Sequence, residues 1–216
     1  SVPARTGERV LELGCGAGPA LCCLGVRVPG LSLTGLEIQP GYAALARRNL
    51  AGNGLEGEVI DGDIAAPPEA LKSRDFHHVI ANPPYFEEAR RSAAPDEGRE
   101  LALAGPVALS VWVGLAARRL RYRGSVTVIQ RVERLPELLG AMQECLGALE
   151  VWPLAPRAGR APRLILARGR KGGRAAFRLH PPLVLHAGAA HIEDGEDYTD
   201  VVRAALREGQ PLNFPT

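Results

Sequence analysis

The sequence has few cysteines and few aromatic residues, and it has no long hydrophobic run. The four cysteines are Cys15, Cys22, Cys23 and Cys145. They lack the spacing of a metal site or of a disulfide framework, so we expect no metal and reduced thiols in a cytoplasmic protein. No run approaches the 18 apolar residues of a membrane span, and no charged-then-apolar leader is present. We therefore expect neither a membrane span nor a signal peptide.

Acidic residues are missing from one stretch of the chain, residues 151–192, although the net charge of the whole chain is only +2. This stretch contains eight lysines and arginines, whereas residues 193–216 contain six acids and two arginines. Residues 1–150 are mildly acidic. One acid-free basic segment in an otherwise balanced chain indicates an anionic partner.

Strand-like and helix-like segments alternate along the chain. Apolar runs predict strands over residues 9–13, 31–38, 57–64, 75–82, 124–131, 149–156 and 162–170. Helical periodicity predicts helices over residues 19–28, 40–54, 109–120 and 135–149. This alternation predicts a single α/β domain over residues 1–216, with a Rossmann-like, doubly wound, seven-stranded and mostly parallel sheet. The last two strands, joined by a short loop, are expected to form an antiparallel C-terminal hairpin.

A glycine-rich turn follows the first predicted strand. The stretch LELGCGAG contains Gly14, Gly16 and Gly18 after the acidic Glu12. In such sheets ligands bind at the carboxyl ends of the strands, and glycines let them approach the backbone. An acid in the turn would repel a pyrophosphate but would suit a ligand that carries an ammonium group. The glycines alone fit an ordinary tight strand–helix turn equally well.

Two further carboxylates follow the next two predicted strands. Glu37 ends the second strand, 19 residues after Gly18, and can accept both hydrogen bonds of a ribose diol. Asp63 closes the third strand and can bind an adenine amino group while Ile64 packs on the ring. Together with the turn, they describe a site for S-adenosylmethionine. The predicted cofactor-binding residues are Glu12, Gly14, Cys15, Gly16, Gly18, Glu37, Ile38, Asp63, Ile64 and Asn82.

The stretch N-P-P-Y, residues 82–85, follows the fourth predicted strand. Pro83 and Pro84 cannot donate to a sheet ladder, so the strand ends at Asn82 and the segment is stiff. The Asn82 side-chain oxygen and the Pro83 carbonyl can each accept one N–H of a planar amine, which turns its lone pair toward an electrophile. Tyr85 can stack on a base. The predicted catalytic residues are Asn82, Pro83, Pro84 and Tyr85.

This combination of motifs resembles class I S-adenosylmethionine-dependent methyltransferases that act on amino groups, and the resemblance covers nearly the whole chain. Within that group, the N-P-P-Y-F stretch, the basic block RAGRAPRLILARGRKGGRAAFRLHPPLVLH and the late Y-T-D are similar to bacterial enzymes that methylate N6 of adenine 37 in a valine tRNA. That family carries a segment before the first strand. The resemblance implies that this segment is missing here, and we expect cofactor binding to be weaker without it.

The resemblance implies a tRNA partner, and the basic segment would supply its phosphate contacts. The predicted RNA-binding residues are Arg90, Arg91, Arg157, Arg160, Arg163, Arg168, Arg170, Lys171 and Arg174. The same segment could also be a solvated basic loop. Two alternatives stay open. N5-glutamine methylation of a protein such as a release factor uses the same N-P-P-Y, and a catalytically silent RNA-binding module would retain only the basic segment. We favour a monomer.

Overall fold

A computed structural model of the protein describes residues 1–85, 107–188, 190 and 196–215. The first part contains β1 (Arg9–Leu13), α1 (Pro19–Arg27), β2 (Ser32–Glu37), α2 (Pro40–Gly52), β3 (Gly57–Asp61), α3 (Glu69–Lys72) and β4 (Phe76–Ala81). The second part contains α4 (Leu109–Arg119), β5 (Leu120–Arg131), the 3-10 helix η3 (Val132–Arg134), α5 (Leu135–Gln143), β6 (Gly147–Ala155), β7 (Leu164–Arg170), β8 (Arg178–Leu179), β9 (Leu183–Val184) and α6 (Asp200–Glu208).

The strands form one twisted sheet in the order β3-β2-β1-β4-β5-β7-β6-β8, and β9 also pairs with β6. Strands β1 to β5 run parallel to one another, while β7 runs antiparallel to both β5 and β6. The predicted fold class is confirmed, including the β6–β7 hairpin. The two-residue strands β8 and β9 add to the seven predicted strands, because segments this short carry no alternation that a sequence could reveal.

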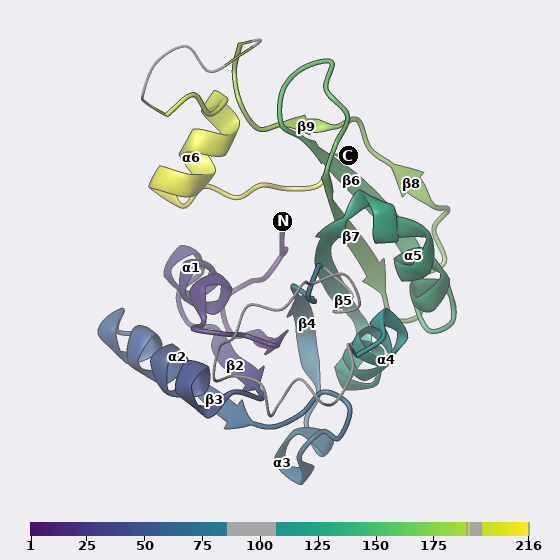
Figure 1. Cartoon of the computed structure of the whole chain (residues 1–216). Coiled ribbons are helices and arrows are strands. Elements are labelled where there is room, and N and C mark those ends of the chain that lie inside the picture. The colour runs from purple at the N-terminus through teal and green to yellow at the C-terminus, as the bar shows by residue number, and fades with distance from the viewer. Residues whose placement is uncertain (86–106, 189, 191–195, 216) are drawn as a thin grey trace, which may run out of the picture.

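Helices cover both faces of the sheet (Figure 1). Helices α1 and α2 enclose one apolar core with residues such as Val10 and Leu33, and α4 and α5 enclose the other with residues such as Leu11 and Val126. Neighbouring residues of β1 belong to different cores because successive side chains of a strand point to opposite faces. Each parallel strand is therefore apolar on both sides, which explains the continuous apolar runs in the sequence.

The sheet has two edges that matter for function. We call the edge where β1 to β5 end the carboxyl edge and the edge where they begin the amino edge. Strand β7 crosses from one to the other, since Leu164 pairs with Arg131 at the end of β5, while Arg170 pairs with Ser125, whose partner on β4 is His78 near the start of that strand. The six residues of β4 separate the two edges by about 20 Å.

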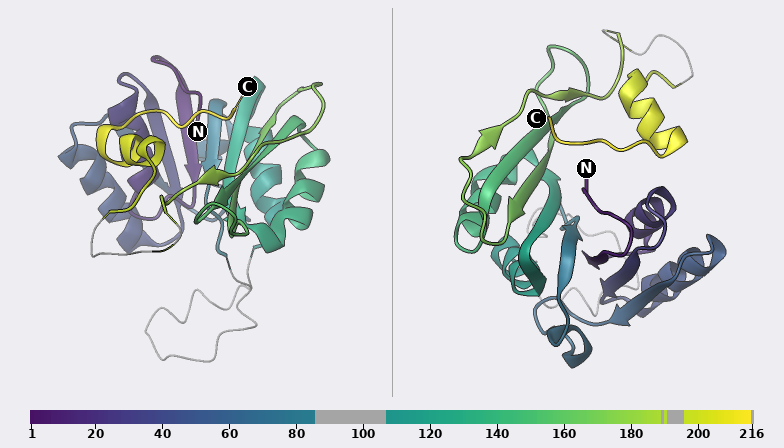
Figure 2. Two further views of the ribbon diagram at one scale, coloured as in Figure 1. Left: turned by 90° about the horizontal axis from the view of Figure 1, so that it is seen from above. Right: turned by 180° about the vertical axis from the view of Figure 1, so that it is seen from behind.

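The C-terminal segment returns to the sheet after α6 (Figure 2). The Y-T-D stretch anchors it, because the ring of Tyr198 stacks on His186 at 4.9 Å and the Thr199 hydroxyl donates to the Val184 carbonyl. Phe214 then packs against Trp152 of β6, with ring centroids 5.4 Å apart. Among the residues described, no helix combines the length and the apolar character needed to cross a membrane.

Candidate functional site

The turn after β1 is built on three glycines with positive φ. Gly14, Gly16 and Gly18 have φ angles of 61°, 53° and 78°. A Cβ on Gly14 would lie 2.7 Å from Cη2 of Trp112, whereas a Cβ on Gly16 would meet no atom within 4 Å. Gly18 is the N-cap of α1. Packing explains Gly14, and Gly16 leaves open space where a ligand can approach the backbone.

Gly14→Ala and Gly16→Ala form a matched pair of substitutions in this turn. Both place a Cβ at positive φ, but only Gly14→Ala also drives it into Trp112. We expect Gly14→Ala to lower the free energy of unfolding by about 1–3 kcal/mol more than Gly16→Ala does. Urea denaturation of the cofactor-free variants measures this difference. Equal losses would show that Trp112 moves aside without cost.

Glu12 is a buried acid with an oxygen that lacks a partner. The backbone N–H of Leu21 donates to its carboxylate, but Oε2 has no hydrogen-bond partner among the described residues. Burial, together with the negative charge of Glu37, raises the pKa of Glu12 to about 8. An unpaired buried acceptor beside the glycine turn fits a ligand that brings a cationic donor, such as the ammonium group of an amino acid.

Glu37 holds the glycine turn in place from the end of β2. Its Oε2 accepts from the Gly16 N–H at 2.8 Å, and its Oε1 accepts from the Gln39 N–H at 2.9 Å. Each carboxylate oxygen has a second lone-pair site, so both can still accept a hydroxyl from a ligand. The predicted role toward a ribose diol is therefore compatible with these contacts.

The end of β3 and the middle of α4 complete this side of the site. Asp63 accepts from the Ala65 N–H at 2.8 Å, and Ile64 is buried next to Gly14 and Trp112. Ile38, by contrast, is largely exposed and offers an apolar surface to a flat ring. The Cys15 side chain points into the core against Gly35, so only its backbone belongs to the turn. Sequence analysis missed Trp112, since it sits in an apolar helix far along the chain.

The N-P-P-Y segment projects from the end of β4. This strand flanks β1 on the side opposite to β2. Asn82 is exposed and hydrogen-bonds to the Tyr85 side chain. Burial raises the pKa of Tyr85, and the hydrogen bond from Asn82 opposes this rise, as expected when the Asn82 amide N–H donates to the phenol oxygen. The Asn82 Oδ1 is then the atom that remains to accept from a substrate.

Two residues that sequence analysis missed donate hydrogen bonds to the backbone carbonyls of the N-P-P-Y segment. The fully buried Gln130, near the end of β5, donates to the Pro83 carbonyl at 3.4 Å. Arg134 donates to the Pro84 carbonyl at 3.3 Å and is itself paired with Glu137 at 2.8 Å. A polar residue inside the apolar run SVTVIQR was the only sequence signal for Gln130.

The predicted basic residues are close in sequence but lie at two different edges of the sheet. Arg160 and Arg163 are exposed in the β6–β7 loop at the carboxyl edge, whereas Arg170 ends β7 at the amino edge and Lys171 and Arg174 follow it there. Arg90 and Arg91 lie outside the described residues.

Two of the predicted cations are engaged within the protein. Arg157 pairs with Asp197 and donates to the Ala187 carbonyl, which ties the β6–β7 loop to the C-terminal segment. Arg168 pairs with Glu150 at 2.9 Å, and its guanidinium lies 4.1 Å from the centroid of the Phe214 ring. Only 11% of the Arg168 side chain is exposed. Both contacts indicate a structural role for these arginines.

Arg168→Met tests the structural role of Arg168. The substitution leaves the largely buried Glu150 carboxylate with His180 as its remaining side-chain hydrogen-bond partner. We expect a loss of about 2–3 kcal/mol in the free energy of unfolding. Arg170→Gln, two residues further along β7 but exposed, is the control and should change stability by less than about 0.5 kcal/mol. A stable Arg168→Met variant would return Arg168 to the candidates for RNA contact.

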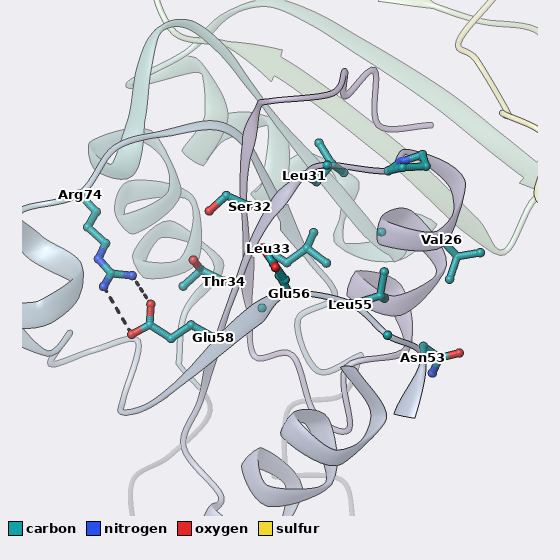
Figure 3. Close-up of a pocket in the computed structure, with 15 residues that line it drawn as sticks. Val26, Leu31, Ser32, Leu33, Thr34, Asn53, Leu55, Glu56, Glu58 and Arg74 are labelled. Atoms are coloured by element: carbon teal, nitrogen blue, oxygen red, sulfur yellow. Dashed lines mark hydrogen bonds and ion pairs between the residues drawn. The ribbon is translucent and has the colours of Figure 1, made fainter. Parts of the chain in front are cut away.

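A hollow of about 810 Å³ lies between the starts of β2 and β3 and their flanking segments (Figure 3). Its lining includes Ser32 and Gly57, the first residues of β2 and β3, so it opens at the amino edge. The ion pair between Arg74 and Glu58 borders it. No predicted cofactor-binding or catalytic residue lines it. The described residues also contain no group of three or more His, Cys, Asp or Glu side chains that could hold a metal ion.

Comparisons with known proteins agree with this geometry. Residues 1–102 match the family model described as methyltransferase small domain. The ribosomal RNA small subunit methyltransferase C of Stutzerimonas stutzeri is 40% identical over 87 residues, which are 40% of this chain and 25% of that protein. The release factor glutamine methyltransferase of Deinococcus radiodurans is 33% identical over 91 residues, 42% of this chain and 31% of that protein. The chain thus spans about a quarter to a third of the length of these curated relatives.

Among solved structures, a predicted O-methyltransferase from Agrobacterium tumefaciens superposes with a TM-score of 0.76 at 27% identity, covering 96% of this chain and 92% of that one. The Thermus thermophilus 16S rRNA N2 G1207 methyltransferase, solved with AdoMet and guanosine, has a TM-score of 0.51 at 20% identity, covering 77% and 38% of the two chains. Residues 1–102 therefore have the sequence of a methyltransferase small domain, and the chain has the fold of class I S-adenosylmethionine-dependent methyltransferases.

Proposed function

We propose that the protein is an S-adenosylmethionine-dependent methyltransferase that acts on the exocyclic N6 of adenine in tRNA, at the anticodon-loop adenine 37 that the sequence resemblance implies. The observation that carries the proposal is the position of the N-P-P-Y segment. It leaves β4 at Ala81, whose pairing partner Leu13 leads directly into the glycine turn. The acceptors for an amine and the candidate cofactor site thus lie on neighbouring strand ends, where the strand order reverses.

The residues present fit the cofactor. S-adenosylmethionine, when bound, supplies an electrophilic methyl group on a sulfonium. Glu12 would hold its ammonium group, because the orphaned Oε2 is a buried acceptor without a partner among the described residues. Gly16 would let it approach the backbone, and Glu37 and Asp63 would bind the ribose and the adenine.

The N-P-P-Y segment would orient the substrate amine. The Asn82 Oδ1 and the Pro83 carbonyl accept its two N–H groups, and these bonds strengthen as the nitrogen becomes tetrahedral in the transition state. The hydrogen bond from Asn82 to Tyr85 and the contacts from Gln130 and Arg134 keep both acceptors in place, so little reorganisation is needed. The Tyr85 ring can stack on the base and align it.

Two observations support an RNA substrate. Arg160 and Arg163 are exposed at the carboxyl edge and carry no hydrogen bond or ion pair through their side chains among the described residues, so they are available to phosphates. Several relatives, among them the Stutzerimonas stutzeri protein, are named as ribosomal RNA methyltransferases.

N5-glutamine methylation of a protein is the second candidate. The relatives from Deinococcus radiodurans and Geobacter sulfurreducens are named release factor glutamine methyltransferases. A glutamine amide is also a planar amine with a delocalised lone pair, and the same two acceptors would orient it. The basic residues are divided between two edges and do not form one continuous RNA groove. A protein substrate, which needs no such groove, is therefore kept as the alternative.

Incubation with labelled S-adenosylmethionine and total tRNA from cells that lack the modification tests the proposal. Nucleoside mass spectrometry should find N6-methyladenosine in the tRNA. Label on a release factor instead would establish the glutamine alternative. Calorimetry supplies the remaining control: a folded protein that does not bind S-adenosylmethionine would be a silent RNA-binding module and not a methyltransferase.

A further inference from the structure

A second basic surface lies at the amino edge, where the strands begin. The candidate active site lies at the opposite ends of these strands. Three adjoining hollows of about 430, 470 and 620 Å³ share Arg123, and two of them also share Arg170. Eight cationic side chains line the three hollows. They are Arg5, Arg9, Arg121, Arg123, Arg170, Lys171, Arg174 and Arg178. We call these residues together with Tyr122 the amino-edge surface.

The three acids that line the same hollows are already paired. Asp75 forms an ion pair with Arg9 and Glu150 forms one with Arg168, while Glu8 is hydrogen-bonded to His78 at 2.9 Å. The exposed Arg170 and Arg174, by contrast, have no side-chain hydrogen bond or ion pair with any residue that the structure describes. The surface therefore has an excess of positive charge that the protein itself leaves uncompensated, and a polyanion is the ligand that this charge suits.

The backbone holds this surface in a fixed shape. The Arg123 N–H donates to the Lys171 carbonyl at 3.1 Å and the Lys171 N–H to the Gly124 carbonyl at 3.0 Å, so the basic first half of β5 is joined to the basic segment after β7. Arg123 has a φ of 66°, a left-handed conformation that costs free energy for a residue other than glycine. A glycine would adopt this φ without strain, so a function of the Arg123 side chain would explain why an arginine stands at this position.

Tyr122 adds an exposed aromatic ring between these arginines. It is 67% exposed, yet one edge of the ring packs against Gly172, where a Cβ would lie only 2.4 Å from Cε2. The guanidinium of Arg123 lies 5.9 Å from the ring centroid. A ring that is held in place, exposed and surrounded by cations is the arrangement on which an unpaired nucleobase stacks while neighbouring phosphates contact the arginines.

We infer that the amino-edge surface is a second RNA-docking site, which binds the sugar–phosphate backbone of the substrate at a distance from the modified base. This inference rests on the proposed action on tRNA. The two edges are about 20 Å apart, and a folded RNA is larger than this separation, so one molecule can contact both edges. Such a contact adds affinity and orientation without reading the sequence. It gives a function to Arg170, Lys171 and Arg174, which the catalytic edge cannot use.

A triple variant Arg121→Gln, Arg123→Gly, Arg174→Gln tests the inference by fluorescence anisotropy with labelled total tRNA. Arg123→Gly removes a charge and relieves the positive φ, so loss of folding should not explain its effect. We expect the dissociation constant at 0.1 M KCl to rise at least tenfold. The slope of log affinity against log salt should fall by about 2 to 3, since three phosphate contacts are lost. Tyr122→Ala should weaken binding several-fold with an unchanged slope, because stacking releases no counterions.

A second triple variant with the same loss of charge is the control. Arg48→Gln, Arg203→Gln and Arg207→Gln remove exposed arginines of α2 and α6 that line none of the three hollows, and should change tRNA affinity by less than threefold. Equal affinities of the wild type and the amino-edge variant would overturn the inference and leave the proposed function standing. A wild type that does not bind tRNA would overturn both. Tighter binding to phosphatidylglycerol vesicles than to tRNA would assign the surface to a membrane and overturn the inference.

Discussion

Asn82→Ala is expected to lower kcat for methyl transfer by about 100- to 1000-fold, the loss typical when one preorganised transition-state hydrogen bond is removed. The proposed role of Asn82 is to accept an N–H of the substrate amine more strongly as the nitrogen becomes tetrahedral. Its loss should therefore reduce kcat far more than it raises KM for RNA. Single-turnover transfer of labelled methyl groups to tRNA, with cofactor in excess, measures the effect on the chemical step.

Tyr85→Phe is the matched control for Asn82→Ala. It keeps the ring that can stack on a base and removes only the hydroxyl that bonds to Asn82. We expect a loss of about tenfold or less, because Asn82 keeps its own acceptor oxygen but is less firmly held. If Asn82→Ala proved no worse than Tyr85→Phe, Asn82 would be a positioning residue at most, and the amine would have to be oriented by other groups.

Glu12→Gln is expected to stabilise the cofactor-free protein at pH 8 and to weaken cofactor binding. The pKa of Glu12 is raised to about 8 in the folded protein, against 4.5 for an ordinary glutamate. The folded state thus binds the proton more tightly than the unfolded state, so stability is lost as pH rises from about 4.5 to about 8. A neutral glutamine removes this loss. The midpoint of thermal unfolding of the Glu12→Gln variant should exceed that of the wild type by several degrees at pH 8 and should match it near pH 5.

The affinity of Glu12→Gln for S-adenosylmethionine should fall at least tenfold, because the buried acceptor for a cationic group is lost. Calorimetry at pH 8 measures this change independently of activity. Glu56→Gln makes the same chemical change at an exposed position and should alter neither the pH dependence of stability nor the affinity. A Glu12→Gln variant that binds as tightly as the wild type would remove Glu12 from the cofactor site, even if its stability at pH 8 rose as expected.

The fold could be predicted, and several residues of the candidate site could be proposed, because both depend on local patterns. The apolar runs of β1 to β7 are long enough to be recognised, and Glu12, Gly16 and Glu37 follow strand ends, which the parallel topology brings to one edge. Short elements such as β8, β9 and α3 have too few residues to carry a pattern. Helix α6 was missed for another reason, since its apolar and polar residues do separate onto opposite faces, but only Val202 of the helix is buried.

The remaining parts of the site depend on neighbours that sequence does not reveal. Trp112, Gln130 and Arg134 act through contacts with residues that are 47 to 98 positions away in the chain. The division of the basic segment between two surfaces could not be predicted for a related reason. Residues 157–174 are close in sequence, but β7 carries the chain from the carboxyl edge to the amino edge, so its two ends serve different surfaces.

The position of β7 between β5 and β6 also constrains how the protein is made. Strand β6 precedes β7 in the chain, yet it pairs with β7 and not with β5. While the chain emerges from the ribosome, β5 therefore has an unpaired flank until Leu164–Arg170 is complete. An unpaired strand flank is a template for aggregation. Slow translation or truncation between Ala155 and Leu164 should thus produce insoluble protein, whereas a pause after Arg170 should leave a nascent chain whose central strands are all paired.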